Sequence, residues 1–283
     1  MDLISAFQKN EDLIADIKSK GSDASHVHIW WLGQSGFLTA WNSLFVLIDP
    51  YLSDSLTEKY HHTNKPHIRI SEILLNPSSL DFIDIVTSSH NHTDHLDAQT
   101  LIPLIKANPN MAMVIPEANR EFVCNRIQMP LDYPIGMKDG MKKNIKGISF
   151  TGVPAAHNLL ERNEKGQCLF MGYVINIGGL NIYHSGDTLL FEGMEEQLKP
   201  MNIDLALLPI NGNDPARGVA GNLDCSEAAM LADKIAAKLT IPCHYDLFSF
   251  NTADPRDFAQ FAGERHINYC ILKLGEHIGI PSK

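Results

Sequence analysis

The sequence predicts an α/β protein that folds as a single domain over residues 1–283. Short apolar runs with the composition of β-strands alternate with segments of helical periodicity along the chain. No internal repeat, low-complexity tract or change of composition marks a linker between two domains. Because 44% of the 283 residues are hydrophobic, the chain is able to bury a substantial core.

The first segment, residues 1–20, is predicted to be an amphipathic helix. Its sequence, MDLISAFQKNEDLIADIKSK, sets charges of both signs into an apolar periodicity and lacks the long uncharged core of a signal peptide. No window of the chain approaches the roughly 18 consecutive apolar residues of a membrane span. Together with five cysteines that form no CxxC pair, this favours a soluble protein of the reducing cytoplasm without a membrane partner.

Residues 26–109 are predicted to contain hairpin strands, a further strand and a helix. HVHIWWLGQSGFLTAWNSLFVLIDPYL has β-rich runs separated by Gly-Gln-Ser-Gly and Trp-Asn-Ser breaks. Residues 53–66 are polar and predict a surface loop. FIDIVTSS is a strand candidate. LDAQTLIPLIKANP has helical spacing, with Asp97 as N-cap and Asn108-Pro109 as the stop signal.

Strands and helices continue to alternate through the rest of the chain. MAMVIP predicts a buried strand and EANREFVCNRIQ a helix, and strand and turn patterns follow in GISFTGVPAAHN, CLFMGYVINIGGLNIYHSGD and IDLALLPING. The clearest helix is LDCSEAAMLADKIAAKL, where Asp224 and Glu227 have the spacing of an N-cap and N3 pair. The short strand candidate TIPCHYD follows it and ends in a histidine.

The negative net charge argues against nucleic acid as a binding partner. The chain carries 23 Lys and Arg against 33 Asp and Glu, a formal charge of −10, whereas a broad hold on nucleic acid needs clustered basic residues. We therefore expect a small molecule, and not a nucleic acid, as the partner. Whether the chain forms a homo-oligomer is left open.

The stretch HNHTDH, residues 90–95, carries the strongest functional signal. His90 and His92 alternate in extended backbone, so both side chains can reach one metal ion, and Asp94 and His95 then turn toward a second position. A solvated polar loop would explain the hydrophilicity but not this order of ligand types. Four ligand-type residues in six positions exceed what one tetrahedral ion takes from such a short segment, so we infer two adjacent ions.

Three later segments supply further ligands at the ends of apolar, strand-like runs. They are His157 in GVPAAHN, Asp187 in NIYHSGD and His244 in TIPCHYD. We expect one edge of the sheets to collect all of these side chains. The hypothesis is that the first ion is held by His90, His92 and His157, and the second by Asp94, His95 and His244, with Asp187 as the bridge. The remaining histidines are expected on the surface or in the core: His26, His28, His61, His62, His67, His266 and His277.

This order of residues resembles the metallo-β-lactamase superfamily, whose mark is H-x-H-x-D-H followed by a later His, Asp and His. The resemblance implies an αββα sandwich, two mixed β-sheets flanked by helices, with a dinuclear site at one edge. A closer resemblance is to the L-ascorbate 6-phosphate lactonase-like hydrolases, in WWLGQSGFL, SSHNHTDHLD, YHSGD, IDLALLPINGNDPARG and AKLTIPCHYDLFSFNTADP. The histidine of PAAHN has no evident counterpart in those lactonases, which leaves the substrate open.

These residues predict metal-assisted hydrolysis. Two cations lower the pKa of a water molecule held between them, so hydroxide is available near neutral pH to attack an ester, lactone or phosphodiester. Asp94 would orient this hydroxide. His184 is either a proton donor or a partner that fixes a ligand, and a core position is equally open. The nitrogen and oxygen donors suit zinc; manganese or iron would also be accommodated, and the lactonase resemblance favours manganese.

The stretch NGNDPARG is the candidate for substrate binding. Arg217 would clamp a phosphate or carboxylate, Asn211 and Asn213 would bind hydroxyl groups, and Tyr245 would line an apolar wall. The alternative is that these residues merely build a turn. The predicted function is hydrolysis of a small, anionic lactone or ester such as a sugar-phosphate lactone. A phosphodiesterase and a non-catalytic module that binds metal or ligand are the alternatives.

Overall fold

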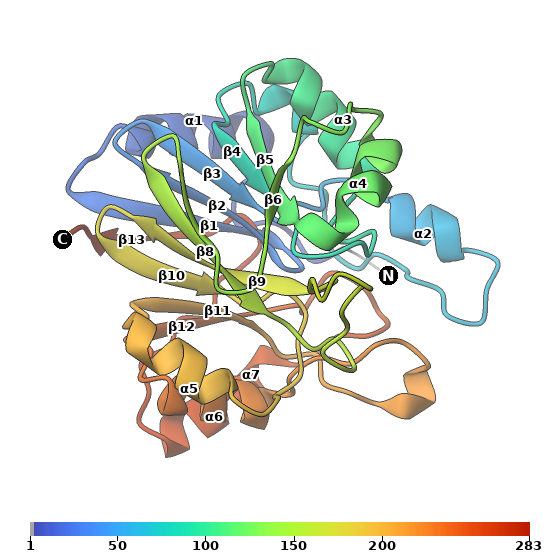
Figure 1. Ribbon diagram of the computed structural model, residues 1–283, viewed down its shortest axis with the longest axis vertical. Coiled ribbons are helices and arrows are strands. Elements are labelled where there is room, and N and C mark those ends of the chain that lie inside the picture. The colour runs from blue at the N-terminus through green and yellow to red at the C-terminus, as the bar shows by residue number, and fades with distance from the viewer. Residues whose placement is uncertain (1–2) are drawn as a thin grey trace.

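Two β-sheets pack face to face in the computed structural model, which describes residues 3–283. Helices α1, α3 and α4 lie over the first sheet, and α5, α6 and α7 lie over the second (Figure 1). This arrangement confirms the sandwich of two mixed sheets flanked by helices that the family resemblance implies.

The first sheet has seven strands in the order β13-β1-β2-β3-β4-β5-β6. The pairs from β13 to β3 are antiparallel, and those from β3 to β6 are parallel. Its central strands are almost entirely buried, as expected where a sheet is covered on both faces. In chain order the strands are β1 His26–Gly33, β2 Gly36–Trp41, β3 Leu44–Ile48, β4 Ile85–Thr87, β5 Ala112–Pro116, β6 Ile135–Met137 and β13 His277–Pro281.

The second sheet has six strands in the order β12-β11-β10-β9-β8-β7. The pairs from β12 to β10 are parallel, and those from β10 to β7 are antiparallel. Consequently β8, β10, β11 and β12 all run in one direction, and their carboxyl ends meet at one edge. The strands are β7 Lys142–Ile145, β8 Ile148–Pro154, β9 Met171–Ile177, β10 Leu180–His184, β11 Leu205–Pro209 and β12 Leu239–Cys243.

Local capping signals begin helices α3 and α6 where the sequence predicts them. The side chain of Asp97 accepts hydrogen bonds from the first backbone amides of α3, and Asp224 and Glu227 form a reciprocal capping box at α6. The helices are α1 Asn10–Gly21, α2 Ser55–Tyr60, α3 Ala98–Ala107, α4 Arg120–Ile127, α5 Met194–Leu198, α6 Cys225–Lys234 and α7 Pro255–Glu264. Within residues 3–283 no helix has the length and apolar character needed to cross a membrane.

The prediction of a helix over residues 1–20 is wrong at its start. Residues 1–2 lie outside the described residues, and the helix begins only at Asn10. The preceding backbone is used elsewhere: Ile4 N donates to Ile70 O at 2.7 Å, and Phe7 N donates to Leu274 O at 2.8 Å. These hydrogen bonds to distant segments compete with a helical turn, and periodicity alone does not reveal them.

The polar segment 53–66 also differs from the predicted loop. It contains the short helix α2, whose Leu56 is buried beside Tyr51, Leu247 and Phe248 in a small apolar cluster. His61 and His62 follow the helix and are exposed, as predicted. This apolar cluster, together with hydrogen bonds from Leu56 N to the Tyr51 hydroxyl and from the Thr57 hydroxyl to His67 O, anchors the helix.

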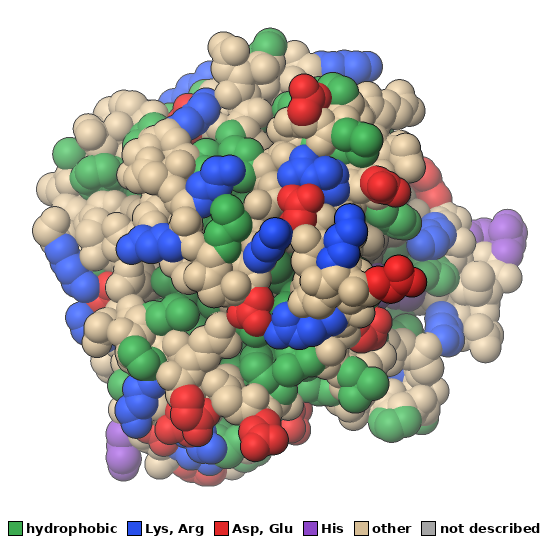
Figure 2. All heavy atoms as spheres, viewed as in Figure 1, with side chains coloured by type: hydrophobic (Ala, Val, Ile, Leu, Met, Phe, Trp, Pro, Cys, Tyr) green, Lys and Arg blue, Asp and Glu red, His purple; other side chains and the backbone are tan. Residues whose placement is uncertain are grey.

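Charge on the surface is mixed. On the face drawn in Figure 2, basic and acidic side chains are interspersed over several elements. The expectation that the chain does not hold nucleic acid still rests on the formal charge of −10 and remains a prediction.

A glycine in β9 sets how closely this strand approaches the turn after β10. A Cβ atom on Gly172 would lie 2.7 Å from His184 O and 2.8 Å from Ser185 O, which are backbone atoms that cannot swing away. This turn leads directly to Asp187.

We predict that Gly172→Ala lowers the free energy of unfolding by about 1–3 kcal/mol, because the new methyl group overpacks a rigid site. Gly263→Ala in α7 is the matched control: its Cβ would meet nothing within 4 Å, and the change is expected to be neutral or slightly stabilising. Equilibrium urea unfolding measures both. Equal stabilities of the two variants would show that the close approach is not a constraint.

Candidate metal centre

Two groups of ligand-type side chains lie at the edge where the strand ends meet. The first group is His90, His92 and His157, and the second is Asp94, His95, Asp187 and His244. Within each group one potential ligand atom per residue lies within 4.8 Å of all the others. These are the seven predicted residues, and the groups differ from the predicted sets in one respect: Asp187, predicted as the bridge, lies with the second group.

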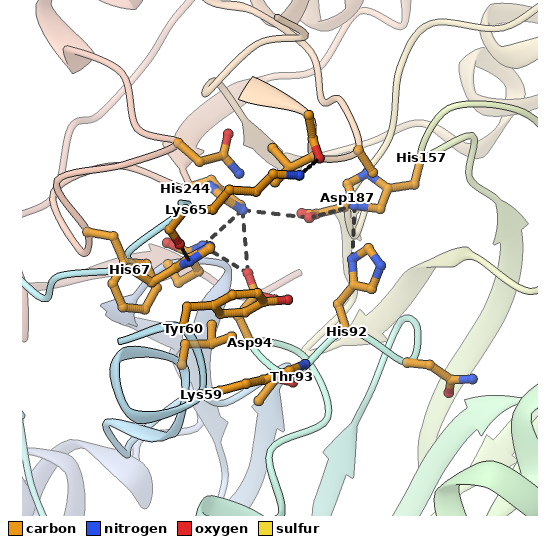
Figure 3. Close-up of a pocket in the computed structure, with 18 of the residues that line it drawn as sticks. Lys59, Tyr60, Lys65, His67, His92, Thr93, Asp94, His157, Asp187 and His244 are labelled. Carbon is orange, nitrogen blue, oxygen red and sulfur yellow. Dashed lines mark hydrogen bonds and ion pairs between the residues drawn. The ribbon is translucent and has the colours of Figure 1, made fainter. Parts of the chain in front are cut away.

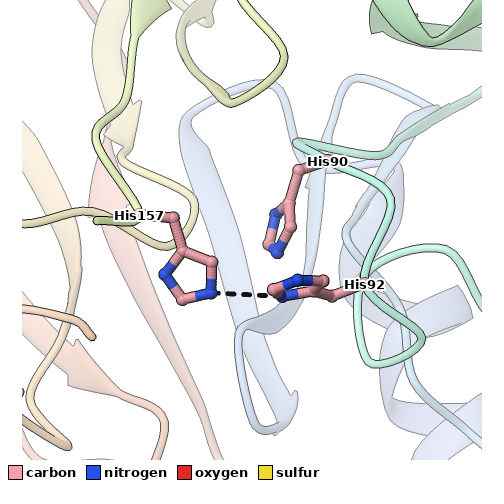
Figure 4. A group of neighbouring side chains, drawn as sticks. All are labelled: His90, His92 and His157. Carbon is pink, nitrogen blue, oxygen red and sulfur yellow. Dashed lines mark hydrogen bonds between the residues drawn. The ribbon is translucent and has the colours of Figure 1, made fainter. Parts of the chain in front are cut away.

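The first group consists of three imidazoles that face one another. In Figure 4 the rings of His90, His92 and His157 point toward a common centre. His92 Nδ1 and His157 Nε2 are 3.1 Å apart, and His90 Nε2 has no hydrogen-bond partner. The other nitrogen of His157, Nδ1, donates to Gly221 O at 2.8 Å, which fixes Nε2 as the free ligand atom.

In the second group, Asp187 reaches both sets of ligands. Its carboxylate lies 3.2 Å from His95 Nε2, 3.6 Å from His244 Nε2 and 3.5 Å from His157 Nε2 of the first group. Asp94 approaches from the other side, 3.6 Å from His244 Nε2. Asp187 is only 3% exposed, so its charge has to be balanced by these neighbours.

Burial determines the protonation of the first group. It holds the pKa of His90 well below the usual value. Burial, followed by the neighbouring His157, lowers the pKa of His92 to about 4. The first group is therefore a set of neutral imidazoles at neutral pH, which is the form that binds metal.

Carboxylates determine the protonation of the second group. Burial alone would lower the pKa of His244, but the charges of Asp187 and Asp94 outweigh it and raise this pKa to about 9. Burial likewise disfavours the charged form of Asp187, yet His95 and His244 hold its pKa well below the usual range. The carboxylates in this group are therefore charged at neutral pH, and a positive charge beside them stabilises them.

The residues present fit a divalent cation. His90 Nε2 is a buried atom without a hydrogen-bond partner, and His95 Nε2 and Asp187 Oδ1, which also lack one, face each other at 3.2 Å in the second group. Such buried orphans are rare in folded proteins unless something else satisfies them. Imidazole nitrogens and carboxylate oxygens are ligands that borderline divalent ions accept.

Two residues that the sequence reasoning missed support the ligands. Asp49 is fully buried and accepts a hydrogen bond from His95 Nδ1 at 2.8 Å, and another from the hydroxyl of Thr87 at 2.8 Å. Gln34 Nε2 donates to Asp94 Oδ2 at 2.9 Å and lies 2.9 Å from His244 Nε2. The available signal was that both follow a strand end, as the ligands do.

Strained backbone conformation accompanies these positions. Gln34, Asp49 and His244 have φ angles of 50°, 41° and 67°, in the left-handed region that residues with a Cβ seldom adopt. Non-glycine residues persist there when the surroundings over-determine the conformation, and such positions cluster at functional sites.

A cavity of about 500 Å³ opens above the two groups. Leu56, Phe122 and Phe248 contribute apolar wall, while Lys59 and Lys65 contribute positive charge. In Figure 3, Lys65 lies above Asp94 and Lys59 lies below it, while His92, His157 and Asp187 lie to their right. His67, expected to have a surface or core role, also lines this cavity.

A family model of the beta-lactamase superfamily domain matches residues 45–245. The match includes all seven ligand-type residues of the two groups. The chain belongs to the metallo-β-lactamase superfamily.

Relatives within this superfamily match the chain over most of its length. It is 31% identical over 261 residues to a UPF0173 metal-dependent hydrolase of Methanosarcina barkeri, with 90% of this chain and 99% of that protein covered. A UPF0173 metal-dependent hydrolase of Archaeoglobus fulgidus is 29% identical over 255 residues, with 88% and 96% covered. The chain is thus a metal-dependent hydrolase of the metallo-β-lactamase superfamily.

Solved structures agree with this family fold. Igni18, a metallo hydrolase from Ignicoccus hospitalis, matches with a TM-score of 0.67 at 21% identity, covering 92% of this chain and all of that one. An isothiocyanate hydrolase from Delia radicum gut bacteria matches with a TM-score of 0.69 at 16% identity, covering 90% and 100%. At these identities the likeness shows the fold alone.

The stretch NGNDPARG does not reach the cavity of this metallo-β-lactamase-fold protein in the predicted way. Arg217 Nη1 donates to Asn251 Oδ1 at 2.7 Å, and Asn211 Nδ2 donates to the same oxygen at 2.9 Å. Asn251 lines the cavity, so these two residues position it from behind. Asn213 is exposed and does not line the cavity.

Tyr245 and His184 also lie outside the cavity. Tyr245 is 2% exposed, stacks on Trp31, and its hydroxyl donates to Leu272 O at 2.5 Å, so its polar end is committed elsewhere. His184 is fully buried; its Nε2 donates to Ser35 O at 2.9 Å and its Nδ1 accepts from Gly186 N at 3.3 Å. A proton donor at His184 is therefore wrong, and its contact with the turn before Asp187 fits the positioning alternative.

We predict that Asp49→Asn weakens metal binding by about 10–100-fold, because the amide no longer holds His95 Nδ1–H with a charged acceptor. The measurement is a competition titration of zinc or manganese against a chromogenic chelator.

Asp204→Asn provides a control matched for burial. Asp204 is 5% exposed and accepts hydrogen bonds from Asn181 N, Lys238 and Lys283, which belong to neither ligand group. It should lower stability without changing metal affinity. Unchanged affinity in Asp49→Asn, or an equal loss in both variants, would remove Asp49 from the metal centre.

Proposed function

We propose that this metal-dependent hydrolase cleaves an ester or lactone of a small, anionic molecule, such as a sugar-phosphate lactone. The observation that carries the proposal is the Asp187 carboxylate, which lies within 3.6 Å of histidine nitrogens from both ligand groups at the floor of the cavity. A carboxylate in this position is suited to bridging two cations.

We further propose that the centre takes two divalent ions, zinc or manganese. Seven ligand-type side chains exceed the three or four that a single tetrahedral ion takes from a protein. The donors are imidazole and carboxylate without thiolate, a set that suits zinc and also accommodates manganese.

Cations bound there would lower the pKa of a water molecule and polarise the scissile carbonyl. The residues of the chain supply orientation. Gln34 donates to Asp94 Oδ2, which leaves Asp94 Oδ1 to accept a hydrogen bond from the attacking water. Hydrogen bonds to Gly221 O and to the Asp49 carboxylate fix the orientation of the His157 and His95 rings. Leu56 and Phe248 are buried side chains that make part of the cavity wall apolar.

The dimensions of the cavity favour a small substrate. A volume of about 500 Å³ lies within the range of pockets that bind single small molecules. All five cysteines are free thiols, which agrees with a reducing compartment, and we propose the cytoplasm as the location.

We predict that His92→Ala and Asp94→Ala each reduce kcat/KM by more than about 100-fold while the fold is retained, because each removes a side chain that holds or orients the reacting groups. The substrate is mono-p-nitrophenyl succinate, assayed with added zinc or manganese and followed by release of p-nitrophenol. Circular dichroism checks the fold.

His62→Ala is the control, because His62 is exposed and outside both ligand groups. It should retain full activity. Retained turnover in both His92→Ala and Asp94→Ala would refute the proposal, and hydrolysis of bis-p-nitrophenyl phosphate in preference to the carboxylic ester would favour a phosphodiesterase.

A further inference from the structure

Positive side chains gather over the cavity without acidic partners of their own. Lys59, Lys65 and Arg126 line it, and the acidic side chains that line it are Asp94 and Asp187, both in the second ligand group. Within residues 3–283, none of the three cations forms a salt bridge to a carboxylate. The chain has a formal charge of −10, yet the three cations that line this cavity outnumber its two acidic side chains.

Lys59 lies directly beside the loop of residues 90–95, which carries the HNHTDH motif and is called the motif loop below. It is exposed on α2, and its Nζ lies 3.4 Å from the hydroxyl of Thr93. Thr93 stands between His92 of the first ligand group and Asp94 of the second. One hydroxyl uses one N–H of an ammonium group, so Lys59 keeps two donors for a ligand.

Lys65 reaches across the cavity from the segment after α2. Its Nζ donates to Gly218 O in the opposite loop (Figure 3). Gly218 has φ 59°, in the left-handed region that favours glycine. His67 Nδ1 donates to Lys65 O at 2.9 Å, and the ring of His67 packs against Tyr60 with centroids 4.5 Å apart. This backbone is therefore held over the cavity.

Arg126, in contrast, is hydrogen-bonded to the backbone of the motif loop. Its Nη1 donates to Asn91 O at 2.7 Å and to Leu96 O at 3.3 Å, which ties together the two ends of the motif loop. These contacts make Arg126 a positioning residue for the ligands. Lys59 and Lys65 make one hydrogen bond each through their ammonium groups and do not hold the backbone of residues 90–95, so they are the cations free to turn toward a ligand.

We propose that Lys59 and Lys65 form an anion-binding subsite that recognises a phosphate or carboxylate group of the substrate, while the scissile carbonyl lies over the two ligand groups. The proposal rests on the proposed hydrolase function and names the specificity-determining residues for it. It also replaces the predicted role of Arg217, whose guanidinium is bound to Asn251.

Each ammonium group can give the bound anion a charge-assisted hydrogen bond. Because the lysines are near solvent, added salt screens the attraction between their charges and the anion. Losing one of the two contacts is expected to weaken anion binding about tenfold at low ionic strength. A neutral molecule of the same shape should bind to the wild type and to the lysine variants with equal affinity.

The test is isothermal titration of the metal-loaded full-length protein with glycerol 3-phosphate, succinate and glycerol, for wild type, Lys59→Met, Lys65→Met and Lys142→Met. Lys142 on β7 is an exposed lysine outside the cavity and serves as the matched control. The expected result is binding of at least one anion, with Kd raised about tenfold in Lys59→Met and Lys65→Met only. The two anions separate phosphate from carboxylate recognition.

Equal Kd values in all four proteins would overturn the proposal, because the anion would then bind at the metal ions alone. Absence of anion binding by wild type would overturn it as well. Lys59→Arg keeps the charge and should restore binding, which separates loss of charge from a disturbed fold.

Turnover distinguishes this proposal from the proposed function. With mono-p-nitrophenyl succinate and the neutral p-nitrophenyl butyrate, the lysine variants should lose kcat/KM about tenfold for the anionic ester only. If wild type hydrolyses neither ester yet binds anions through the lysines, the hydrolase proposal fails and the subsite stands. If both esters are affected equally, the subsite fails and the hydrolase proposal stands.

Discussion

The buried carboxylate of Asp187 is the constraint on which the centre depends. It is 3% exposed and lies within 3.6 Å of histidine nitrogens of both ligand groups. A charge buried this deeply requires compensation, so side chains from the ends of strands in both sheets converge on it. Gly172 and His184 pack against the turn that carries Asp187, which couples the register of β9 and β10 to the position of the carboxylate.

Local patterns were sufficient to predict much of the fold and the side chains that gather at the candidate metal centre. The seven ligand-type residues follow strand-like runs, and the direction of those strands brings their ends to one edge. A pattern visible in a few consecutive residues therefore predicts that side chains far apart in the sequence meet. The caps at Asp97 and Asp224 were equally local, because a cap acts within one helical turn. The family resemblance supplied the two-sheet architecture, which periodicity does not give.

Residues recognised only through distant contacts were missed. Asp49 lies 46 positions from His95, and Gln34 lies 60 positions from Asp94, so their position after a strand end does not by itself distinguish them from ordinary turn residues. Arg217 was assigned to substrate on chemistry alone, but its partner Asn251 decides where the guanidinium points. Lys59 and Lys65 sit in a polar segment that resembles a solvated loop, and only the packing of α2 places them over the cavity.

The number of divalent ions bound per chain tests the bridging role of Asp187 most directly. The purified protein is stripped with a chelator, incubated with excess zinc or manganese and passed through a desalting column. Elemental analysis then gives the ratio of metal to protein. A plateau of two ions per chain is expected if Asp187 joins two ligand groups that each hold an ion. A plateau of one ion or fewer with both metals would contradict a dinuclear centre.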